Sequence, residues 1–362
     1  MAQRKPRRAT ATGPNTSKIK RLLYALLGVI LFSGLLLAYN LYERTYRTNV
    51  STTLPGESSY LEIPTGSEWR DVLFLLQQGN FLRDVPSFEW VAQKAGYPER
   101  VLPGRYKIEQ GMNNVELVKM LASGRQEPVR LVINKFRNKY DLFGAVARRL
   151  EADSTRLAQL FTDDKLMRKH GFNEENSLAM IIPNTYEFWW NTSALEFLEK
   201  MRKENEVFWT AERKEKARRL GLTPAEVMTL ASIVEEETNQ LEEKGTIARV
   251  YLNRLSIGMK LQADPTVRFA IGDFTIKRVR GAMLSHPSPY NTYYAEGLPP
   301  GPICTPSIPT IDAVLNSSPN DYLYFCARED FSGFHSFAKN YRDHQLNAQK
   351  YQKALNQRNI LR

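Results

Sequence analysis

One long apolar run lies near the start of the chain, and shorter periodic patterns follow it. Residues 22–39 (LLYALLGVILFSGLLLAY) contain no charged side chain, and their number approaches the roughly 20 residues that a membrane-spanning helix needs. Residues 40–42 extend the run to the level of the lipid head groups. The pattern therefore predicts a single transmembrane helix over residues 22–42.

The charges around this run predict its orientation. Residues 1–21 hold seven basic side chains and no acid, whereas only Arg44 and Arg47 follow closely after the run. By the positive-inside rule, the basic tail 1–21 is cytoplasmic and the body of the chain lies outside the cytoplasm, at the plasma (inner) membrane. A cleaved signal peptide begins in the same way. No clear small-x-small cleavage site follows this run, however, so we expect an anchor.

The overall basicity belongs mainly to this tail. The formal net charge of +11 includes the seven basic residues of 1–21, which leaves +4 for the rest of the chain. We therefore expect no nucleic-acid partner. The hydrophobic content of 42% is ordinary for a globular protein, so the body is long enough to form domains with cores of their own.

A small unit follows a polar stretch. Residues 43–57 are Ser/Thr-rich and predict a flexible linker. Residues 58–127 contain two passages in which a strand-like segment, 60–63 and then 105–108, is followed by a turn and a helical pattern. This order resembles the LysM-type module that binds N-acetylglucosamine-containing glycans. A small α+β spacer is the alternative reading.

Residues 128–362 predict a larger mixed domain. A strand over 129–133 precedes helical patterns, and an aromatic segment at 181–190 (IIPNTYEFWW) is expected to lie mostly in a core. The predicted fold class is thus α+β throughout: a transmembrane helix, a LysM-like module and a mixed catalytic domain.

A helix with a defined start carries three consecutive acids. Thr223, Pro224 and Glu226 form the pieces of a capping box. The helical phase then places Val227, Leu230, Ala231 and Val234 on a buried stripe, with Glu236 on the opposite, solvated side. Glu235 and Glu237 fall at the two borders, where partial burial raises a carboxyl pKa and makes a general acid. Alternatively, all three are surface acids.

Loops rich in amides, hydroxyls and rings follow this helix, at residues 258–267, 289–293 and 297–302, and are typical of a carbohydrate cleft. The four histidines lack the spacing of zinc ligands, so we expect no metal and no cofactor. The sequence leaves open whether Cys304 and Cys326 form a disulfide.

Four motifs in fixed order resemble those of the MltG/YceG-like endolytic murein transglycosylases. They are LASIVEEET, YLNRLSIGMKLQADPTVRFAIG, SPYNTYYAEGLPPGPICTPS and YLYFCAREDFSGFHSF. The resemblance implies cleavage of the β-1,4 bond between N-acetylmuramic acid and N-acetylglucosamine within peptidoglycan strands, leaving a 1,6-anhydromuramyl end. One carboxyl suffices for this reaction, because the C6 hydroxyl of the sugar replaces water as the nucleophile.

The resemblance also implies roles for individual residues. The catalytic glutamate follows the segment A-S-I-V directly, which makes it Glu235. The substrate-binding residues would be Gln262, Asp264, Tyr290, Asn291 and Thr292, with Glu237 and His335 as auxiliary residues. Two positions depart from the family pattern: Asn184 replaces an aspartate and Glu236 replaces a lysine.

These features together predict a membrane-anchored enzyme that limits the length of nascent glycan strands in association with peptidoglycan synthases. Two alternatives have different chemistry. One is a glycan-binding scaffold for synthases without catalytic activity, and the other is a hydrolase whose product ends are one water heavier than anhydro ends.

Overall fold

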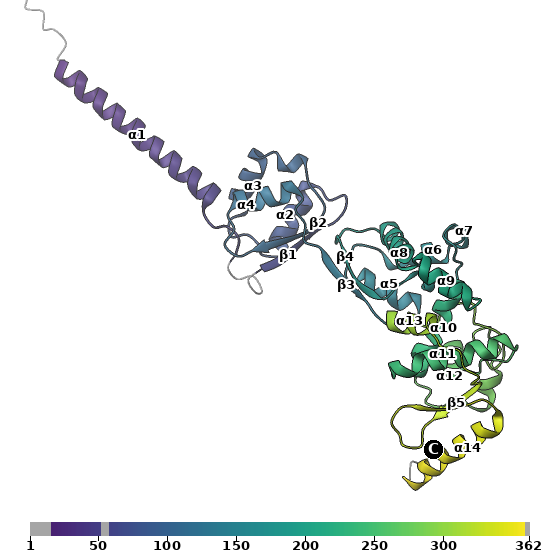
Figure 1. Ribbon diagram of the computed structural model, residues 1–362. Helices are drawn as coiled ribbons and strands as arrows, with labels where there is room; N and C mark the ends of the chain where they lie inside the picture. Colours follow the sequence, from purple (N-terminus) through teal and green to yellow (C-terminus); the bar gives the residue numbers. More distant parts are fainter. Residues whose placement is uncertain (1–15, 52–57, 359–362) are drawn as a thin grey trace, which may run out of the picture. The chain divides into compact units, whose positions relative to one another are not determined.

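The computed structural model describes residues 16–51 and 58–358 (Figure 1). The chain divides into two compact units, residues 1–127 and 128–362. Helices and two-stranded antiparallel sheets occur in both units, which confirms the predicted mixed α+β class. Most of the predicted cytoplasmic tail lies outside the described residues.

The apolar run forms helix α1 (Thr16–Tyr46), which extends beyond the predicted span of 22–42 at both ends. Its apolar side chains, such as Leu22 and Phe32, are largely exposed. By length and composition this helix could cross a membrane.

The chain after α1 is packed onto the first unit, although a flexible linker was expected from residue 43 onward. Residues 43–46 continue the helix, and Asn49 and Val50 are only 4% and 0% exposed. The Asn49 amide nitrogen donates to the Asp84 carbonyl and to Asn114 Oδ1 at 2.7 Å each, while Asn49 Oδ1 accepts from the Asp84 amide at 2.7 Å. The linker prediction therefore fails as far as Ser51, and residues 52–57 lie outside the described residues.

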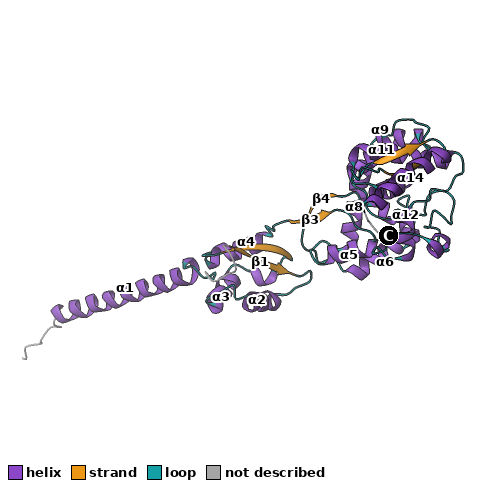
Figure 2. Ribbon diagram, turned by 90° about the horizontal axis from the view of Figure 1, so that it is seen from below, coloured by secondary structure: helices purple, strands orange, loops and turns teal. Residues whose placement is uncertain are grey.

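The first unit is a two-stranded sheet with helices packed on it (Figure 2). Its elements are β1 (Ser58–Ile63), α2 (Trp69–Gln78), α3 (Val85–Lys94), the 3-10 helix η1 (Tyr97–Glu99), β2 (Gly104–Glu109) and α4 (Asn114–Ser123). The two strands are antiparallel, with Leu61 opposite Tyr106, and both side chains are buried in the core. The expected strands and helices are present, while the likeness to LysM modules stays a prediction.

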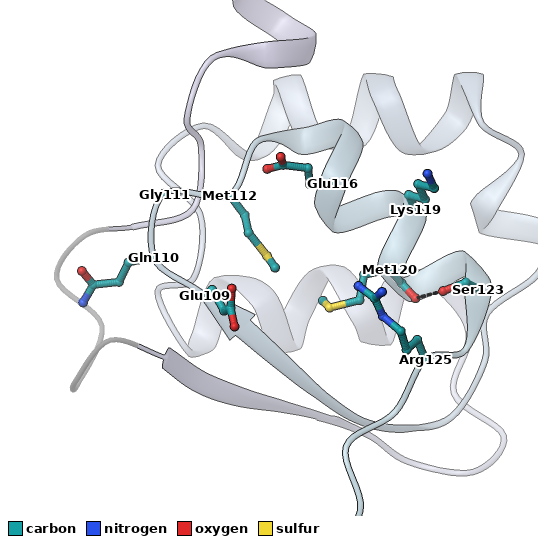
Figure 3. A pocket seen from close by; sticks show the side chains of 9 residues that line it. All are labelled: Glu109, Gln110, Gly111, Met112, Glu116, Lys119, Met120, Ser123 and Arg125. Carbon is teal, nitrogen blue, oxygen red and sulfur yellow. Dashed lines mark hydrogen bonds between the residues drawn. The ribbon is translucent and has the colours of Figure 1, made fainter.

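A hollow of about 800 Å³ lies between the end of β2 and α4 in this unit (Figure 3). Met112 and Met120 line it together with charged side chains, among them Glu116, Lys119 and Arg125.

The second unit contains two hydrophobic cores. The first core joins the sheet of β3 (Val129–Ile133) and β4 (Asn184–Phe188) to the helices α5 (Lys139–Ala147), α6 (Ser154–Thr162), α7 (Asp164–Arg168) and α8 (Ala194–Phe208). Tyr186 and Phe188 are buried here, as expected for the aromatic segment, whereas Trp189 is exposed.

The second core is built around α10 (Pro224–Glu237) and its neighbours. The elements that contact α10 are η2 (Ser177–Met180), α9 (Ala211–Arg219), α11 (Leu241–Ser256), α12 (Asp264–Ile271) and α13 (Ile308–Leu315). The same part of the unit also contains the 3-10 helix η3 (Gly281–Ser285), the hairpin of β5 (Tyr324–Ala327) and β6 (His335–Ala338), and α14 (Tyr341–Gln357). Cys304 and Cys326 are free thiols.

Helix α10 is buried around its whole circumference. The predicted capping box forms, because Thr223 and Glu226 bond each other's backbone amides. Every residue from 227 to 234 is buried, however, rather than a single stripe, since α11, α12, α13 and η2 all contact the helix. The three acids are the last residues of α10, and the backbone becomes extended at Thr238.

We predict that Asn49→Ala loosens the first unit, because the alanine leaves the Asp84 backbone and the buried Asn114 side-chain oxygen without this partner. The free energy of local opening should fall by about 2 kcal/mol. Hydrogen–deuterium exchange of residues 48–51 and 81–92 in the full chain measures this change. Thr48→Ala, at an exposed side chain, should exchange like the wild type, and an equal effect of both substitutions would contradict the anchoring role of Asn49.

Candidate active site

A cleft of about 680 Å³ lies at the carboxyl end of α10. Its walls come from the ends and faces of several elements of the second unit. The lining residues include Glu236 and Glu237 from α10, Tyr251 and Arg254 from α11, Gln262, Asp264 and Arg268 at or in α12, Tyr293, Tyr324 and His335 from the loops and hairpin, and Tyr341, His344 and Tyr351 from α14.

Glu237 is the carboxylic acid in this cleft with the most perturbed protonation. Its Oε1 accepts a hydrogen bond of 2.6 Å from the buried Tyr251 hydroxyl. Burial, and to a smaller extent the negative charge of Asp264, raise the pKa of Glu237 to about 7, although Tyr251, Arg268 and Arg254 act in the opposite direction. A carboxyl group with this pKa is present in both protonation states near neutral pH, as proton transfer in both directions requires.

Gln262 and Asp264 line the same cleft at the start of α12. Asp264 Oδ1 accepts a hydrogen bond of 2.7 Å from the Tyr293 hydroxyl. Gln262 has a positive φ of 50°, which is costly for a residue with a side chain and is typical of functional positions. Its backbone amide donates to the Thr292 carbonyl at 3.1 Å, so the neighbouring loop holds this conformation.

Asn291 and Thr292 lie behind the cleft wall, whereas direct contact with the substrate was expected. They are 0% and 1% exposed. The Asn291 amide donates to the carbonyls of Leu284 and His286 at 3.1 and 2.9 Å. Thr292 Oγ1 accepts from the Ala263 amide at 2.9 Å. Because these side chains form their hydrogen bonds with backbone groups, both residues position the loop that carries Gln262 and Asp264.

Tyr290 is likewise outside the cleft lining. Its ring packs on Phe269 with 4.8 Å between the centroids, and its hydroxyl donates to the Glu175 carbonyl at 3.4 Å. Burial raises the pKa of Tyr290 to about 12. The residue therefore supports α12 from the side.

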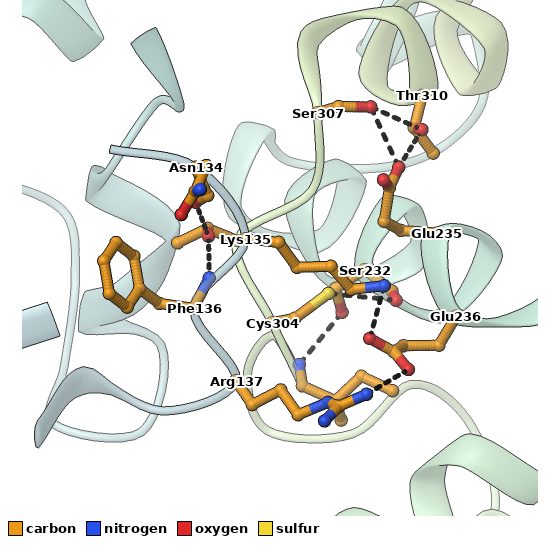
Figure 4. Close-up of polar contacts among 12 residues, drawn as sticks. Asn134, Lys135, Phe136, Arg137, Ser232, Glu235, Glu236, Cys304, Ser307 and Thr310 are labelled. Atoms are coloured by element: carbon orange, nitrogen blue, oxygen red, sulfur yellow. Dashed lines mark hydrogen bonds and ion pairs between the residues drawn. The ribbon is translucent and has the colours of Figure 1, made fainter. Parts of the chain in front are cut away.

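Glu235 belongs to a separate polar cluster between α10, α11 and α13 (Figure 4). Its Oε2 accepts hydrogen bonds from Lys244 Nζ and Ser307 Oγ at 2.9 Å each, and from the Thr310 hydroxyl. Burial alone would raise the pKa of Glu235, but the bonds from Thr310, Lys244 and Ser307 and the charge of Lys244 together lower it. The expectation of a raised pKa at this residue is therefore wrong, because hydrogen bonds from Thr310, Lys244 and Ser307 and the charge of Lys244 stabilise the carboxylate.

Glu236 is also partnered, whereas a solvated side chain was expected. Its side chain is 15% exposed and forms ion pairs with Lys135 at 2.7 Å and Arg137 at 3.6 Å (Figure 4). Both cations lie in the segment that follows β3. Thr305 holds this segment against the second core, because the Thr305 hydroxyl donates to the Asn134 carbonyl at 2.6 Å. The glutamate at this position thus faces two cations where a lysine would be repelled.

His335 lines the cleft from β6 and is held by a residue that the sequence did not single out. Glu243 in α11, only 6% exposed, accepts from the His335 backbone amide at 2.8 Å and lies 3.0 Å from its Nδ1. Tyr251 and Arg254 were missed as well. They stand three residues apart on one face of α11, but a helical pattern alone does not show which pocket that face lines.

Asn184, which replaces an aspartate of the family pattern, is not part of this cleft. Asn184 begins β4, is exposed, and accepts a hydrogen bond from the Thr185 amide at 2.8 Å. Among residues 16–51 and 58–358, no group of three or more His, Cys, Asp and Glu side chains could hold a metal ion.

The second unit thus presents a mixed α+β scaffold with a buried carboxyl group of raised pKa in a polar and aromatic cleft. The model of the YceG-like family matches residues 61–350, and the chain belongs to this family.

Related proteins have been named for their activity. An endolytic murein transglycosylase of Bacillus subtilis (strain 168) is 26% identical over 313 residues, which cover 82% of this chain and 86% of that protein. An endolytic murein transglycosylase of Streptococcus pneumoniae (strain R6) is 25% identical over 323 residues, covering 80% of this chain but 57% of that protein. A crystal structure of a YceG-like protein from Listeria monocytogenes matches with a TM-score of 0.53 at 25% identity and covers 81% of this chain and 99% of that one.

We predict opposite effects of two isosteric substitutions on stability at pH 7. Glu235→Gln leaves buried Lys244 without its counter-charge and should cost about 3 kcal/mol. Glu237→Gln should cost nothing or stabilise the fold. The pKa of Glu237 is raised to about 7 in the folded state, so the folded state loses stability as the pH rises from the pKa of an unfolded glutamate toward 7. For Glu235, whose pKa is lowered, the stabilisation is lost as the pH falls through the folded value.

Hydrogen–deuterium exchange of residues 224–256 in the full chain, at pH 5 and pH 8, measures both effects. A larger loss of protection for Glu237→Gln than for Glu235→Gln at pH 8 would contradict this assignment of the two carboxyl groups.

Proposed function

We propose that this protein is a membrane-anchored endolytic murein transglycosylase with Glu237 as its acid and base. The reaction would cut the β-1,4 bond between N-acetylmuramic acid and N-acetylglucosamine within glycan strands and leave 1,6-anhydromuramyl ends. One observation carries the proposal: Glu237, whose pKa burial raises to about 7, lines the cleft at the carboxyl end of α10. Membership of the YceG-like family and the names of its relatives support the choice of substrate.

In the first step, protonated Glu237 donates its proton to the glycosidic oxygen as the bond from that oxygen to C1 breaks. The C6 hydroxyl of the muramyl residue then attacks C1, and its proton passes to the Glu237 carboxylate. A C1–O6 bond replaces the C1–O4 bond, no water is consumed, and the acid returns to its starting state. The reaction needs one carboxyl group because the nucleophile is intramolecular.

The neighbours of Glu237 suit the charge that develops. Asp264 favours the positive charge that builds up at C1 as the bond breaks, and it also helps to keep Glu237 protonated beforehand. The Tyr251 hydroxyl holds the carboxyl group in place. Gln262 and His335 face the same cleft and supply hydrogen bonds to the sugars. Asn291 and Thr292 shape its wall, and Tyr290 supports α12.

The family resemblance pointed to Glu235 as the catalytic residue, and the geometry leads us to choose Glu237 instead. Glu235 would have to give up its bonds to Lys244, Ser307 and Thr310 before it could carry a proton, and it is not among the residues that line the cleft. Glu237 needs no such rearrangement.

The first unit would hold the enzyme close to newly made strands. We propose that α1 spans the inner membrane over residues 22–42, with the tail 1–21 in the cytoplasm and both units outside it. The LysM-like module of residues 58–127 would bind glycan, residues 128–362 would cut it, and peptidoglycan synthases would be the protein partners. A tether raises the effective concentration of the enzyme at the surface where its substrate is made.

The products of uncrosslinked glycan strands test this function directly. The full chain in detergent should generate internal fragments with anhydromuramic ends, identified by mass spectrometry. Glu237→Gln should reduce the rate by at least about 100-fold, because the general acid and base is lost. Folded Glu235→Gln protein should retain most of the activity.

Three results would contradict the proposal. Loss of cutting in Glu235→Gln but not in Glu237→Gln would return the catalytic role to Glu235. Ends heavier by one water would indicate a hydrolase, and strands bound but left intact by the wild type would indicate a glycan-binding scaffold.

We predict that kcat/KM falls as the pH rises through about 7, because Glu237 must carry its proton in the free enzyme. Asp264→Asn removes a charge that raises this pKa, so the alkaline fall in its residual activity should move to lower pH. Asp273→Asn changes an exposed aspartate whose carboxylate bonds Thr275 and should leave the profile unchanged. A profile of Asp264→Asn that matches the wild type would contradict the coupling between the two acids.

A further inference from the structure

The loop between α12 and η3 carries three exposed cations, and a fourth, half-buried cation precedes it in α12. We define the basic strip as Arg268, Lys277, Arg278 and Arg280. The only acid within residues 268–286 is Asp273, and its carboxylate accepts hydrogen bonds from the Thr275 amide and hydroxyl at 2.8 and 2.6 Å. In the part of the chain that the structure describes, no member of the basic strip forms an ion pair with an acid.

The strip is continuous with the candidate active site. Arg268 lines the cleft, and its Nη2 donates to the Lys277 carbonyl at 3.5 Å. Its Nε is buried and, within the described residues, has no hydrogen-bond partner. The loop is also held from the other side, because the Arg137 guanidinium lies 4.7 Å from the ring centroid of Phe274. Arg268 therefore connects the cleft to the loop that carries the other three cations.

A run of charged residues on a protein surface is usually only a solvated face. Helix α9 is an example in this chain, because its cations are paired with acids of the same helix. There Lys216 pairs with Glu212 at 2.8 Å, and Arg218 and Arg219 pair with Glu215 at 2.8 and 3.1 Å. Within the described residues, the loop cations of the strip, Lys277, Arg278 and Arg280, form no such ion pairs, whereas Arg268 interacts with the charge of Glu237 in the cleft. Neighbouring cations without counter-charges repel each other and attract an anionic ligand.

Resting on the proposed function, we propose that the basic strip binds carboxylates of the short peptides that murein strands carry. Each muramyl residue bears a peptide with free carboxylates on its lactyl group, so a strand lying in the cleft brings these anions to the rim. Arginine side chains bind carboxylates through paired N–H donors. The strip thereby makes peptide-bearing strands the preferred substrate.

The test compares two preparations of the same uncrosslinked strands. In one the peptide carboxylates are free, and in the other they are converted to N-methylamides, which keeps the peptides and removes the charge. The variant Lys277→Gln/Arg278→Gln/Arg280→Gln should raise KM about tenfold on free strands with little change in kcat. On amidated strands it should match the wild type, which also shows that the variant is folded.

A matched control removes the same amount of charge elsewhere in the second unit. Lys165, Lys169 and Lys203 are exposed and do not line the cleft. The variant Lys165→Gln/Lys169→Gln/Lys203→Gln should match the wild type on both substrates.

Equal KM values for the wild type and the strip variant on free strands would overturn the proposal. So would an equal rise on both substrates, because the strip would then bind something other than carboxylates. If the wild type cuts neither preparation, the proposed function fails, and cosedimentation of the full chain with the strands decides the matter. Preference for free over amidated strands, lost only in the strip variant, would support the basic strip, and no preference would overturn it.

Discussion

The hydrogen bond of 2.6 Å from Tyr251 to Glu237 is the contact on which the candidate active site depends. An acid at the carboxyl end of a helix opposes the helix dipole, and burial adds a cost for the charged form. The packing of α10 on all sides offsets this cost. Because the helix ends at Glu237, the packing also fixes the position of this side chain. Tyr251, from the neighbouring α11, then holds the carboxyl group at the cleft.

Three adjacent carboxyl groups therefore have three different environments. Glu235 is paired with Lys244 between helices, Glu236 with Lys135 and Arg137 from the segment after β3, and Glu237 with a neutral tyrosine in the cleft. Successive positions on a helix point about 100° apart, so each meets a different neighbouring element. Only the third acid lacks a direct ion pair within the described residues, and it is the one whose pKa lies near neutrality.

Local sequence signals predicted much of the fold. The capping box at Thr223, the apolar run of α1 and the strands β1 and β2 follow from short-range chemistry, and they are present. The single buried stripe on α10 and the flexible linker were wrong because tertiary packing decided both. Five elements, α9, α11, α12, α13 and η2, contact α10, and Asn49 bonds to residues 35 and 65 positions away.

The candidate site shows a similar limit. Gln262 and Asp264 were expected at the cleft and line it, whereas Asn291 and Thr292 turn their polar groups to the backbone. A sequence shows which side chains can form hydrogen bonds but not whether the backbone already uses them. For the same reason the partners of Glu235, which lower its pKa, could not be found from α10 alone.

Direct titration of Glu237 tests the central claim. Infrared difference spectra of the full chain, recorded between pH 5 and 9, show the C=O stretch of each protonated carboxyl group as it ionises. The wild type should show a band that disappears with a midpoint near 7. This band should be absent in Glu237→Gln and present in Glu235→Gln. The catalytic role of Glu237 would be contradicted if no carboxyl group of the wild type titrated above about pH 5.5, close to the range of ordinary glutamates, or if the band vanished in Glu235→Gln instead.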